Sequence, residues 1–264
     1  MSVFHHNILE GKIALITGGG SGINFGIARK LVAHGAKVAL ISRTQEKLDA
    51  AAAQLSPEGT HAVGFAADVR DPDALKSAID KTKATFGKID IVINGAAGNF
   101  LAPAAMLSPN GFKTVMDIDA LGTFNTSRLC FEHLCENGGV ILNITATQAW
   151  IPTPLQIHAG AAKAAIQKMT QDLALEWGPM GIRVIAIAPG PIDDTEGMSR
   201  LATPEMKATL ESKMPARRYG HVDEIGDAAV FLCSDAAKFI TGTTLVVDGG
   251  QSLIGSAGFL DFIS

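Results

Sequence analysis

A glycine-rich segment near the beginning of the chain, Thr17–Asn24, has residue types and spacing that bind phosphate groups. It directly follows the β-branched run Lys12–Thr17 and leads into the helical pattern Ile23–His34. A strand, a glycine-rich turn and a helix in this order place backbone N–H groups and the helix N-terminus against a pyrophosphate. The residues expected to contact a dinucleotide here are Gly18, Gly20, Ser21, Gly22 and Ile23. An ordinary turn without a ligand is the alternative, and the strand–turn–helix order favours binding.

The choice between the two nicotinamide dinucleotides depends on the tip of the second expected strand, which ends Ile41–Arg43. An acidic residue at this tip would bind the ribose 2′-hydroxyl of NAD, whereas an arginine accommodates the 2′-phosphate of NADP. Arg43 therefore predicts NADP(H) as the cofactor. A solvated arginine at the start of a helix is the alternative interpretation.

Short β-branched runs alternate with Ala- and Leu-rich helical patterns along the chain, and these elements must position the phosphate loop. Continuously apolar strands are typical of a parallel sheet covered by helices on both faces. With right-handed crossovers, the pattern predicts a single-domain α/β fold, a doubly wound Rossmann fold with a seven-stranded parallel sheet. The expected strands are Lys12–Thr17, Lys37–Ser42, His61–Ala66, Ile89–Asn94, Gly139–Ile144, Arg183–Ala188 and Thr243–Val247. The expected helices include Ile23–His34, Gln45–Leu55, Pro72–Phe86, Gly111–Cys135 and His158–Trp177.

The ligand crevice of such a sheet lies beyond the carboxyl ends of its strands. The segment 190–215, rich in turn and polar residues, follows the sixth expected strand. It is expected to be a mobile substrate lid.

Composition and charge argue against several classes of function. Apolar residues make up 47% of the 264 residues, which is ample for a hydrophobic core. The formal net charge of −4 gives no reason to expect nucleic acid or a membrane surface as a partner. No apolar run reaches the roughly 18 residues of a membrane span. The adjacent His5 and His6 are a weak ligand set, so no metal is expected.

The ends of the chain and its cysteines bear on location. Neither a signal peptide at the N-terminus nor a peroxisomal address at the C-terminus is recognisable. Three cysteines without a C-x-x-C spacing indicate a reducing compartment. A cytoplasmic location is therefore expected.

Several segments together resemble the short-chain dehydrogenase/reductase family over essentially the full length of the chain. They are Thr17–Asn24, Asp68–Val69, Asn94–Ala97, Lys163, Pro189–Ile192 and Val247–Gly250. The cofactor contacts that the resemblance implies are Asp68 and Val69 at the adenine, Asn94 and Ala96 beside the cofactor, Lys163 at the nicotinamide ribose, Ile192 and Thr195 at the carboxamide, and Pro189 and Gly190. Two residues depart from the family pattern, because Asn24 replaces the last glycine of the motif and Ile185 replaces an asparagine.

The usual catalytic tyrosine of this family is missing. When Lys163 is taken as the lysine of the family motif, the tyrosine position holds Ala159, the serine position Ala146 and the asparagine position Asp119. The only tyrosine of the chain, Tyr219, belongs to no Tyr-x-x-x-Lys motif. Reduction of a ketone needs a proton donor beside the carbonyl oxygen, so ordinary carbonyl reduction loses its acid. Reduction of a conjugated C=C bond instead sends charge to a distant thioester oxygen and later takes its proton on carbon. Such a reaction needs an oxyanion donor rather than a phenol.

The local sequences resemble one branch of the family, the peroxisomal-type 2,4-dienoyl-CoA reductases. The segments concerned are 96–100, 107–110, 115–119, 143–147, 158–163 and 189–197. The resemblance implies that NADPH reduces a 2,4-dienoyl-CoA at C5 in unsaturated fatty acid β-oxidation, and that protonation at C2 leaves a 3-enoyl-CoA. The mitochondrial branch is more distant, since its alternative tyrosine would fall near Gln148.

Three residues receive catalytic roles from this resemblance. The Asn99 amide would hydrogen-bond the thioester oxygen, and Asp119, paired with Lys163, would orient or supply the proton, through water. The alternatives are a turn cap for Asn99 and a helix–strand bridge for Asp119. His158 neighbours the vacant tyrosine position, but adjacent residues of a helix point about 100° apart, so a structural role is expected for it.

The resemblance also implies that the acyl-CoA substrate contacts Arg70, Phe100 and Ser108. A surface salt bridge, core packing and a helix cap, respectively, are the alternatives for these residues. Two long helices, Gly111–Cys135 and His158–Trp177, are apolar over most of their circumference, and family members commonly pair them, so a homotetramer is expected. Two other functions stay open: a related thioester or carbonyl reductase with a relocated acid, and a catalytically silent NADP(H)-binding regulator.

Overall fold

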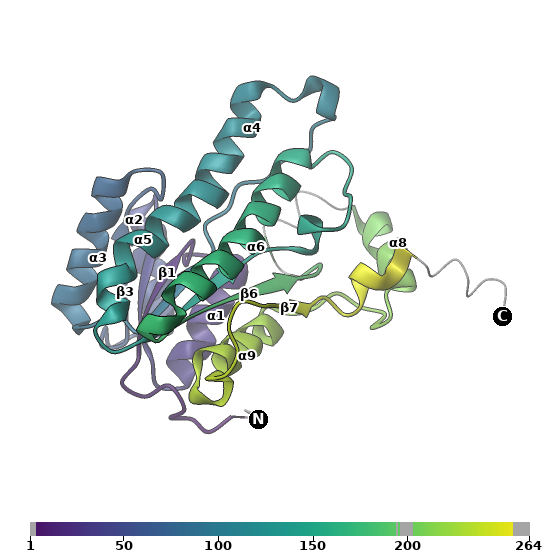
Figure 1. Ribbon diagram of the computed structural model, residues 1–264. Helices are drawn as coiled ribbons and strands as arrows, with labels where there is room; N and C mark the ends of the chain where they lie inside the picture. Colours follow the sequence, from purple (N-terminus) through teal and green to yellow (C-terminus); the bar gives the residue numbers. More distant parts are fainter. Residues whose placement is uncertain (1–3, 194, 196–202, 256–264) are drawn as a thin grey trace.

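A seven-stranded parallel sheet forms the centre of the computed structural model, which describes residues 4–193, 195 and 203–255 (Figure 1). Its described strands are β1 (Ile13–Thr17), β2 (Lys37–Ser42), β3 (Ala62–Ala66), β4 (Ile91–Asn94), β5 (Gly139–Ile144), β6 (Ile182–Pro189) and β7 (Thr244–Val247). Their spatial order is β3-β2-β1-β4-β5-β6-β7. The chain therefore winds outward in both directions from the β1–β4 pair, which confirms the predicted doubly wound fold and places its switch point.

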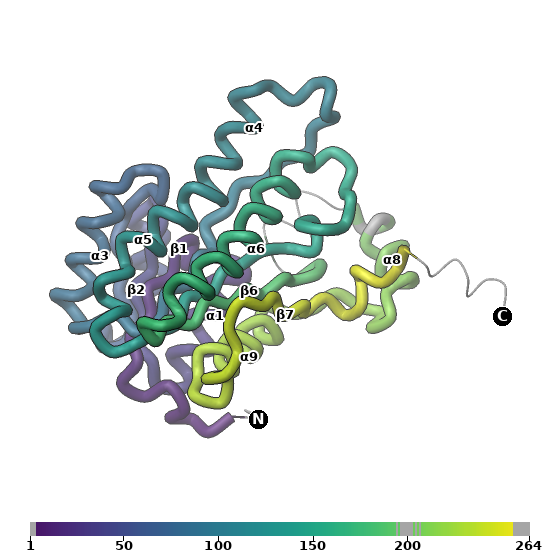
Figure 2. Tube along the Cα trace, viewed as in Figure 1, coloured from purple at the N-terminus to yellow at the C-terminus, as the bar shows by residue number. Residues whose placement is uncertain are grey.

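Helices cover both faces of the sheet, as the continuously apolar strands require. On one face lie α1 (Gly22–Ala33), α2 (Gln45–Leu55) and α9 (Val222–Cys233), and on the other lie α3 (Pro72–Phe86), α5 (Gly122–Cys135) and α6 (Ile157–Trp177). Successive strand residues point to opposite faces, so Ile16 joins the first core while Leu15 joins the second. Figure 2 traces this path, with α3 on the left and α8 on the right.

The long helix expected over Gly111–Cys135 contains an irregularity. The helix α4 (Pro109–Met116) continues into α5 through a π-helical turn at Asp117–Leu121. Such turns are rare in proteins, and many of those that do occur are at functional sites. The one extra residue in this turn leaves the apolar pattern nearly unchanged, so the sequence pattern predicted one uninterrupted helix. Asp119 lies within the turn and is completely buried.

The segment expected to be a lid falls partly on described residues. Within 190–215, Ile192 forms an isolated parallel bridge with Gly220, and α8 (Pro204–Lys213) follows. Residues 194 and 196–202 lie outside the described residues, so the lid stays a prediction. Among the described helices, none has the length and apolar character to cross a membrane.

Candidate active site

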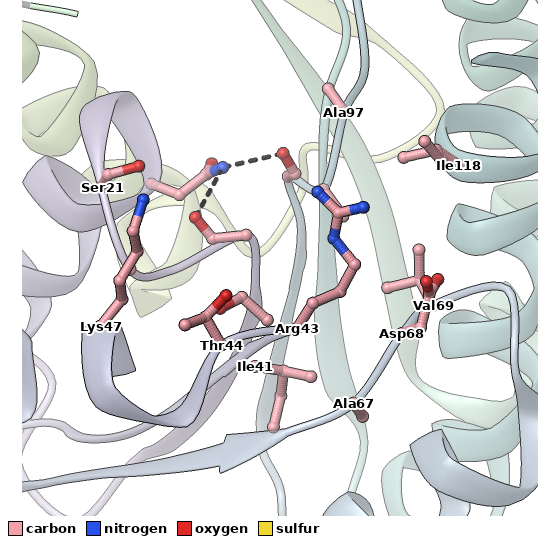
Figure 3. A pocket seen from close by; sticks show the side chains of 16 residues that line it. Ser21, Ile41, Arg43, Thr44, Lys47, Ala67, Asp68, Val69, Ala97 and Ile118 are labelled. Atoms are coloured by element: carbon pink, nitrogen blue, oxygen red, sulfur yellow. Dashed lines mark hydrogen bonds between the residues drawn. The ribbon is translucent and has the colours of Figure 1, made fainter. Parts of the chain in front are cut away.

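A cavity opens at the switch point of the sheet, beyond the carboxyl ends of β1, β2 and β4 (Figure 3). In its floor Gly18 has a φ of +69°, and a Cβ at this position would lie 3.0 Å from the Gly95 oxygen. Both the left-handed backbone and the close approach favour glycine. The Ser21 side chain makes no capping hydrogen bond at the start of α1, so the first N–H groups of the helix are left for an anion. This cradle fits the pyrophosphate of a dinucleotide.

Most residues expected to contact the cofactor surround this edge of the sheet. Those that line the cavity are Gly18, Gly20, Ser21, Arg43, Asp68, Val69 and Ala96. Gly22 begins α1, and a Cβ on it would lie 4.0 Å from the Thr195 methyl group. Pro189 and Gly190 line a second cavity, whereas the Ile23 and Ile192 side chains pack with the apolar core.

The side chain of Asn94, which is predicted to lie beside the cofactor, is directed into the protein interior. Its amide nitrogen donates to Ser127 Oγ at 2.9 Å and to Asn143 Oδ1 at 2.8 Å. Asn143 in turn donates to Thr170 Oγ1 at 2.9 Å. This buried network joins β4 and β5 to the helices α5 and α6, and it stabilises the sheet directly below the site.

Two cationic side chains line the cavity near the tip of β2. Arg43 follows β2, Lys47 lies in the first turn of α2, and both are exposed (Figure 3). Neither forms an ion pair within the part of the chain that the structure describes. Sequence reasoning identified Arg43 and missed Lys47, which lies four residues further along the chain, inside α2, and lines the same cavity. Together they can bind a phosphate on the ribose.

A buried ion pair joins the two predicted catalytic residues. Lys163 Nζ lies 3.1 Å from Asp119 Oδ2, and the side chains are only 10% and 1% exposed. Asp119 Oδ1 accepts a hydrogen bond from the Gly98 N–H at 2.7 Å, and Lys163 Nζ donates to the Ile144 oxygen at 3.1 Å. Buried charges are tolerated only when paired and hydrogen-bonded in this way. The π-helical turn and α6 therefore hold a carboxylate and an ammonium group together at fixed positions.

The two alanines at the vacant serine and tyrosine positions lie near the same edge of the sheet. Ala159 is buried on α6, and Ala146 lines the second cavity, whose volume is about 660 Å³. Tyr219 also lines this cavity. Burial raises the pKa of the Tyr219 phenol, and the nearby Glu211 carboxylate raises it further. The phenol is therefore neutral at physiological pH.

Three side-chain amides meet beside the second cavity. Asn99 Nδ2 donates to Gln156 Oε1 at 2.6 Å, and Gln148 Nε2 donates to the same oxygen at 2.8 Å. Sequence reasoning singled out Asn99 but missed Gln156, which lies 57 residues away at the start of α6. The acceptor on Gln156 determines that Asn99 presents its NH₂ group on this side.

The Phe100 ring, 41% exposed, lies over the buried His158 ring with their centroids 4.3 Å apart. Both ring nitrogens of His158 lack a hydrogen-bond partner in the described part of the protein. The aromatic pair gives His158 a packing role beneath the exposed face of Phe100. The Phe100 ring is therefore supported from below by His158 and exposed on its other face, where an acyl chain can reach it.

The other two predicted substrate contacts have partners within the protein. Arg70 forms an ion pair with Asp68, its Nη2 lying 2.6 Å from Oδ2, and the guanidinium lowers the pKa of the Asp68 carboxyl. Ser108 caps α4 by accepting from the Gly111 N–H at 3.0 Å. The salt bridge and the helix cap are therefore present, and contact of Arg70 and Ser108 with the substrate stays a prediction. No group of three or more His, Cys, Asp or Glu side chains suited to a metal occurs among the described residues.

Comparison with known proteins links this geometry to a family. The profile of the family described as Enoyl-(Acyl carrier protein) reductase matches residues 18–252. A peroxisomal 2,4-dienoyl-CoA reductase [(3E)-enoyl-CoA-producing] of Danio rerio is 47% identical over 254 residues, which cover 95% of this chain and 85% of that protein. A crystal structure of a short chain dehydrogenase from Bacillus anthracis has a TM-score of 0.84 at 40% identity, covering 92% of this chain and 97% of the other. A gluconate 5-dehydrogenase from Burkholderia cenocepacia, in complex with NADP and tartrate, has a TM-score of 0.88 at 32% identity, with coverages of 94% and 98%.

Proposed function

The chain belongs to the short-chain dehydrogenase/reductase family, and we propose that it is an NADPH-dependent reductase that converts a 2,4-dienoyl-CoA to a 3-enoyl-CoA. The name of the Danio rerio relative supports this substrate and this product. The observation that carries the proposal is the buried pair of Asp119 and Lys163 next to alanine at positions 146 and 159. This arrangement retains a proton-handling carboxylate and lacks the phenol that carbonyl reduction requires.

The reaction places two demands on the protein. When bound, the dinucleotide supplies a hydride to C5 of the dienoyl thioester, and the electrons move through the conjugated bonds to leave a dienolate with its charge on the thioester oxygen. The protein must then stabilise that oxygen and deliver a proton to C2, which leaves the double bond between C3 and C4. The oxygen calls for a hydrogen-bond donor, and the proton calls for a positioned acid or water.

Asn99 is suited to bind the thioester oxygen. Its amide donates one hydrogen to Gln156, so the second N–H of the same nitrogen remains for another acceptor. An asparagine turned the other way would present its own oxygen and repel the dienolate. Gln156 therefore holds Asn99 in the orientation that stabilises negative charge.

Asp119 and Lys163 are suited to handle the proton. Asp119 Oδ1 is held by the Gly98 N–H, and Oδ2 faces Lys163 Nζ. Because Oδ2 faces the cationic Lys163 Nζ and accepts no hydrogen bond within the described part of the protein, the carboxylate has an oxygen with which to orient a water molecule for protonation at C2. Lys163 extends from the second turn of α6, where its ammonium group would also hold the nicotinamide ribose.

NADP(H) is the proposed dinucleotide. Arg43 and Lys47 line the cavity at the place where the ribose 2′-phosphate would lie. The related Burkholderia cenocepacia structure contains NADP, which supports the same choice. The Arg43 and Lys47 side chains therefore distinguish NADPH from NADH in this account.

Replacing Asn99 with alanine should lower kcat about 30-fold. Loss of one oxyanion donor in a dry site costs about 10²–10³-fold, and the exposed position of Asn99 reduces the effect. Steady-state kinetics with 2,4-hexadienoyl-CoA measures kcat, with Asn137→Ala as the matched control because Asn137 is exposed just before β5, at the opposite edge of the sheet. Equal kcat values for the Asn99→Ala and Asn137→Ala proteins would remove Asn99 from the reaction.

Replacing Tyr219 with phenylalanine should change kcat by less than about twofold, because the proposed reaction uses no phenol. Tyr219 lines the second cavity and is the one residue that could serve as a relocated acid of the tyrosine type. The substitution keeps the ring and removes only the hydroxyl group. A fall of about 10²-fold in kcat with unchanged NADPH binding would favour the alternative function, a carbonyl or enoyl reductase with a relocated acid.

A parallel assay tests the proposed function. NADPH consumption is followed with 2,4-hexadienoyl-CoA and with a 3-oxoacyl-CoA at equal concentrations. The proposal predicts turnover of the dienoyl thioester and little of the oxo thioester. Turnover of neither substrate, together with tight NADPH binding, would favour a catalytically silent NADP(H)-binding regulator.

The homotetramer and the cytoplasmic location stay predictions. Exposed apolar side chains on α5 and α6, among them Phe124 at 41% and Leu175 at 83%, offer surfaces that another subunit could cover. The Danio rerio relative is named a peroxisomal enzyme, so the peroxisome is a second location to test.

A further inference from the structure

Asn24 connects two loops that form the cofactor cavity. It lies in the first turn of α1, and its Nδ2 donates to the Gly95 oxygen at 2.8 Å and to the Gly18 oxygen at 3.4 Å. Figure 3 draws these two hydrogen bonds as dashed lines. Gly18 belongs to the β1–α1 loop, and Gly95 directly follows β4. One side chain thus holds the phosphate loop against the segment after β4.

Gly95 leaves the space that this side chain occupies. A Cβ on Gly95 would lie 2.1 Å from Asn24 Oδ1 and 2.3 Å from its Cγ, far inside van der Waals contact. Gly95 is not among the glycines with positive φ, so its backbone conformation does not require glycine. The three atoms nearest to such a Cβ all belong to the Asn24 amide, and the two residues therefore form a complementary pair.

The Asn24 side chain is retained at a cost. Its Oδ1 is buried and has no hydrogen-bond partner within the described part of the protein, which is unfavourable for a polar atom. The glycine that the family motif has at this position would avoid this cost but could make neither hydrogen bond. The two bonds from Nδ2 are therefore the physical reason for an asparagine here.

The segment after β4 also contains Asn99 and the donor that holds Asp119. Thr17 Oγ1, at the end of β1, accepts from the Gly95 N–H at 3.1 Å. Three residues further along, Gly98 donates to Asp119 at 2.7 Å, and Asn99 follows directly. Movement of Gly95 away from the phosphate loop would therefore displace the donor that holds the Asp119 carboxylate.

We propose that Asn24 is a positioning residue that clamps the phosphate loop onto the segment after β4, so that cofactor binding and the placement of Asp119 depend on each other. The inference rests on the proposed function in one respect, that a nicotinamide dinucleotide occupies the cavity shown in Figure 3. The complementarity of Asn24 and Gly95 is independent of the substrate. It can therefore be tested without turnover.

A double-mutant cycle tests the clamp. The Kd for NADPH, from fluorescence titration, and the Tm are measured for the wild type, Asn24→Ala, Gly95→Ala and the double variant. Asn24→Ala should raise the Kd for NADPH about tenfold. Alanine keeps the Cβ and has a high helix propensity, so this rise reports the loss of the two amide hydrogen bonds and not a weaker helix. Gly95→Ala alone should raise Kd more than about tenfold and lower Tm, because the new methyl group meets the Asn24 amide. In the Asn24→Ala background the same Gly95 substitution should change Kd by less than about twofold, since the obstacle is gone.

Two outcomes would overturn the inference. In the first, the double variant shows the product of the two single fold-changes in Kd and the sum of the two single shifts in Tm, so that the residues are not coupled. In the second, the Asn24→Ala protein binds NADPH like the wild type. Gly178→Ala is the control, because Gly178 has a φ of −53° and nothing lies within 4 Å of an added Cβ. It should change neither Kd nor Tm. A wild type that does not bind NADPH would count against the proposed function, and the Tm cycle would then still decide whether Asn24 and Gly95 are coupled.

Discussion

Replacing Asp119 with asparagine is expected to lower kcat for a 2,4-dienoyl-CoA about 10³-fold, within the range for loss of a group that transfers or orients a proton. Asparagine keeps the shape of the side chain and an oxygen that can accept from the Gly98 N–H, but it lacks the charge that pairs with Lys163. Steady-state kinetics measures kcat, and titration with NADPH measures cofactor binding. The Kd for NADPH should change by much less than kcat, because the Gly98 N–H can still donate to the asparagine oxygen and so keep the segment after β4 in place.

The neighbouring Asp117 provides the matched control for this substitution. It lies in the same π-helical turn and forms an ion pair with Lys113 at the surface. Surface pairs of this kind contribute about 0–1 kcal/mol, so Asp117→Asn should leave both kcat and stability nearly unchanged. Asp119→Asn leaves the Lys163 ammonium buried without its partner, so its Tm should fall, and kinetics are measured well below that Tm. Near-normal kcat in a folded Asp119→Asn protein would exclude this carboxylate from the mechanism.

Replacing both Arg43 and Lys47 with alanine should raise the Kd for NADPH about 10²-fold, because each removes a charge-assisted hydrogen bond to the 2′-phosphate. The Kd for NADH, which has no such phosphate, should change less than about threefold. Titrations of the single and double variants with both dinucleotides measure the effect. Lys76→Ala is a suitable control, since Lys76 pairs with Asp80 on the surface of α3. Equal weakening of NADPH and NADH would show that the two cations do not read the ribose phosphate.

The fold could be predicted closely because its signals are local. Each strand is a short apolar run, the helix Pro72–Phe86 has the predicted bounds, and the glycine loop lies between β1 and α1 as expected. These features depend on hydrophobic periodicity and on turn residues within a few positions. The π-helical turn at Asp117–Leu121 could not be predicted in this way, since one additional residue barely disturbs the pattern.

The site could be predicted only in part. The resemblance brought Asp119 and Lys163 into one site, and the structure places them 3.1 Å apart. It could not reveal the acceptor of Asn99, because Gln156 is 57 residues away and the pairing depends on how two loops meet. Likewise, Asn24 was noted only as a departure from the glycine motif, while its role depends on the backbone of a distant strand.

The position of an isotopic label tests the central claim, that reduction occurs on carbon of a conjugated thioester without a phenol. The protein is incubated with NADPH deuterated at the transferable position of nicotinamide C4, together with 2,4-hexadienoyl-CoA and a 3-oxoacyl-CoA in competition, and the products are analysed by NMR and mass spectrometry. We expect deuterium at C5 of a 3-enoyl-CoA, with the proton at C2 coming from solvent. Deuterium on the carbinol carbon of a 3-hydroxyacyl-CoA, with the dienoyl thioester left unlabelled, would contradict it.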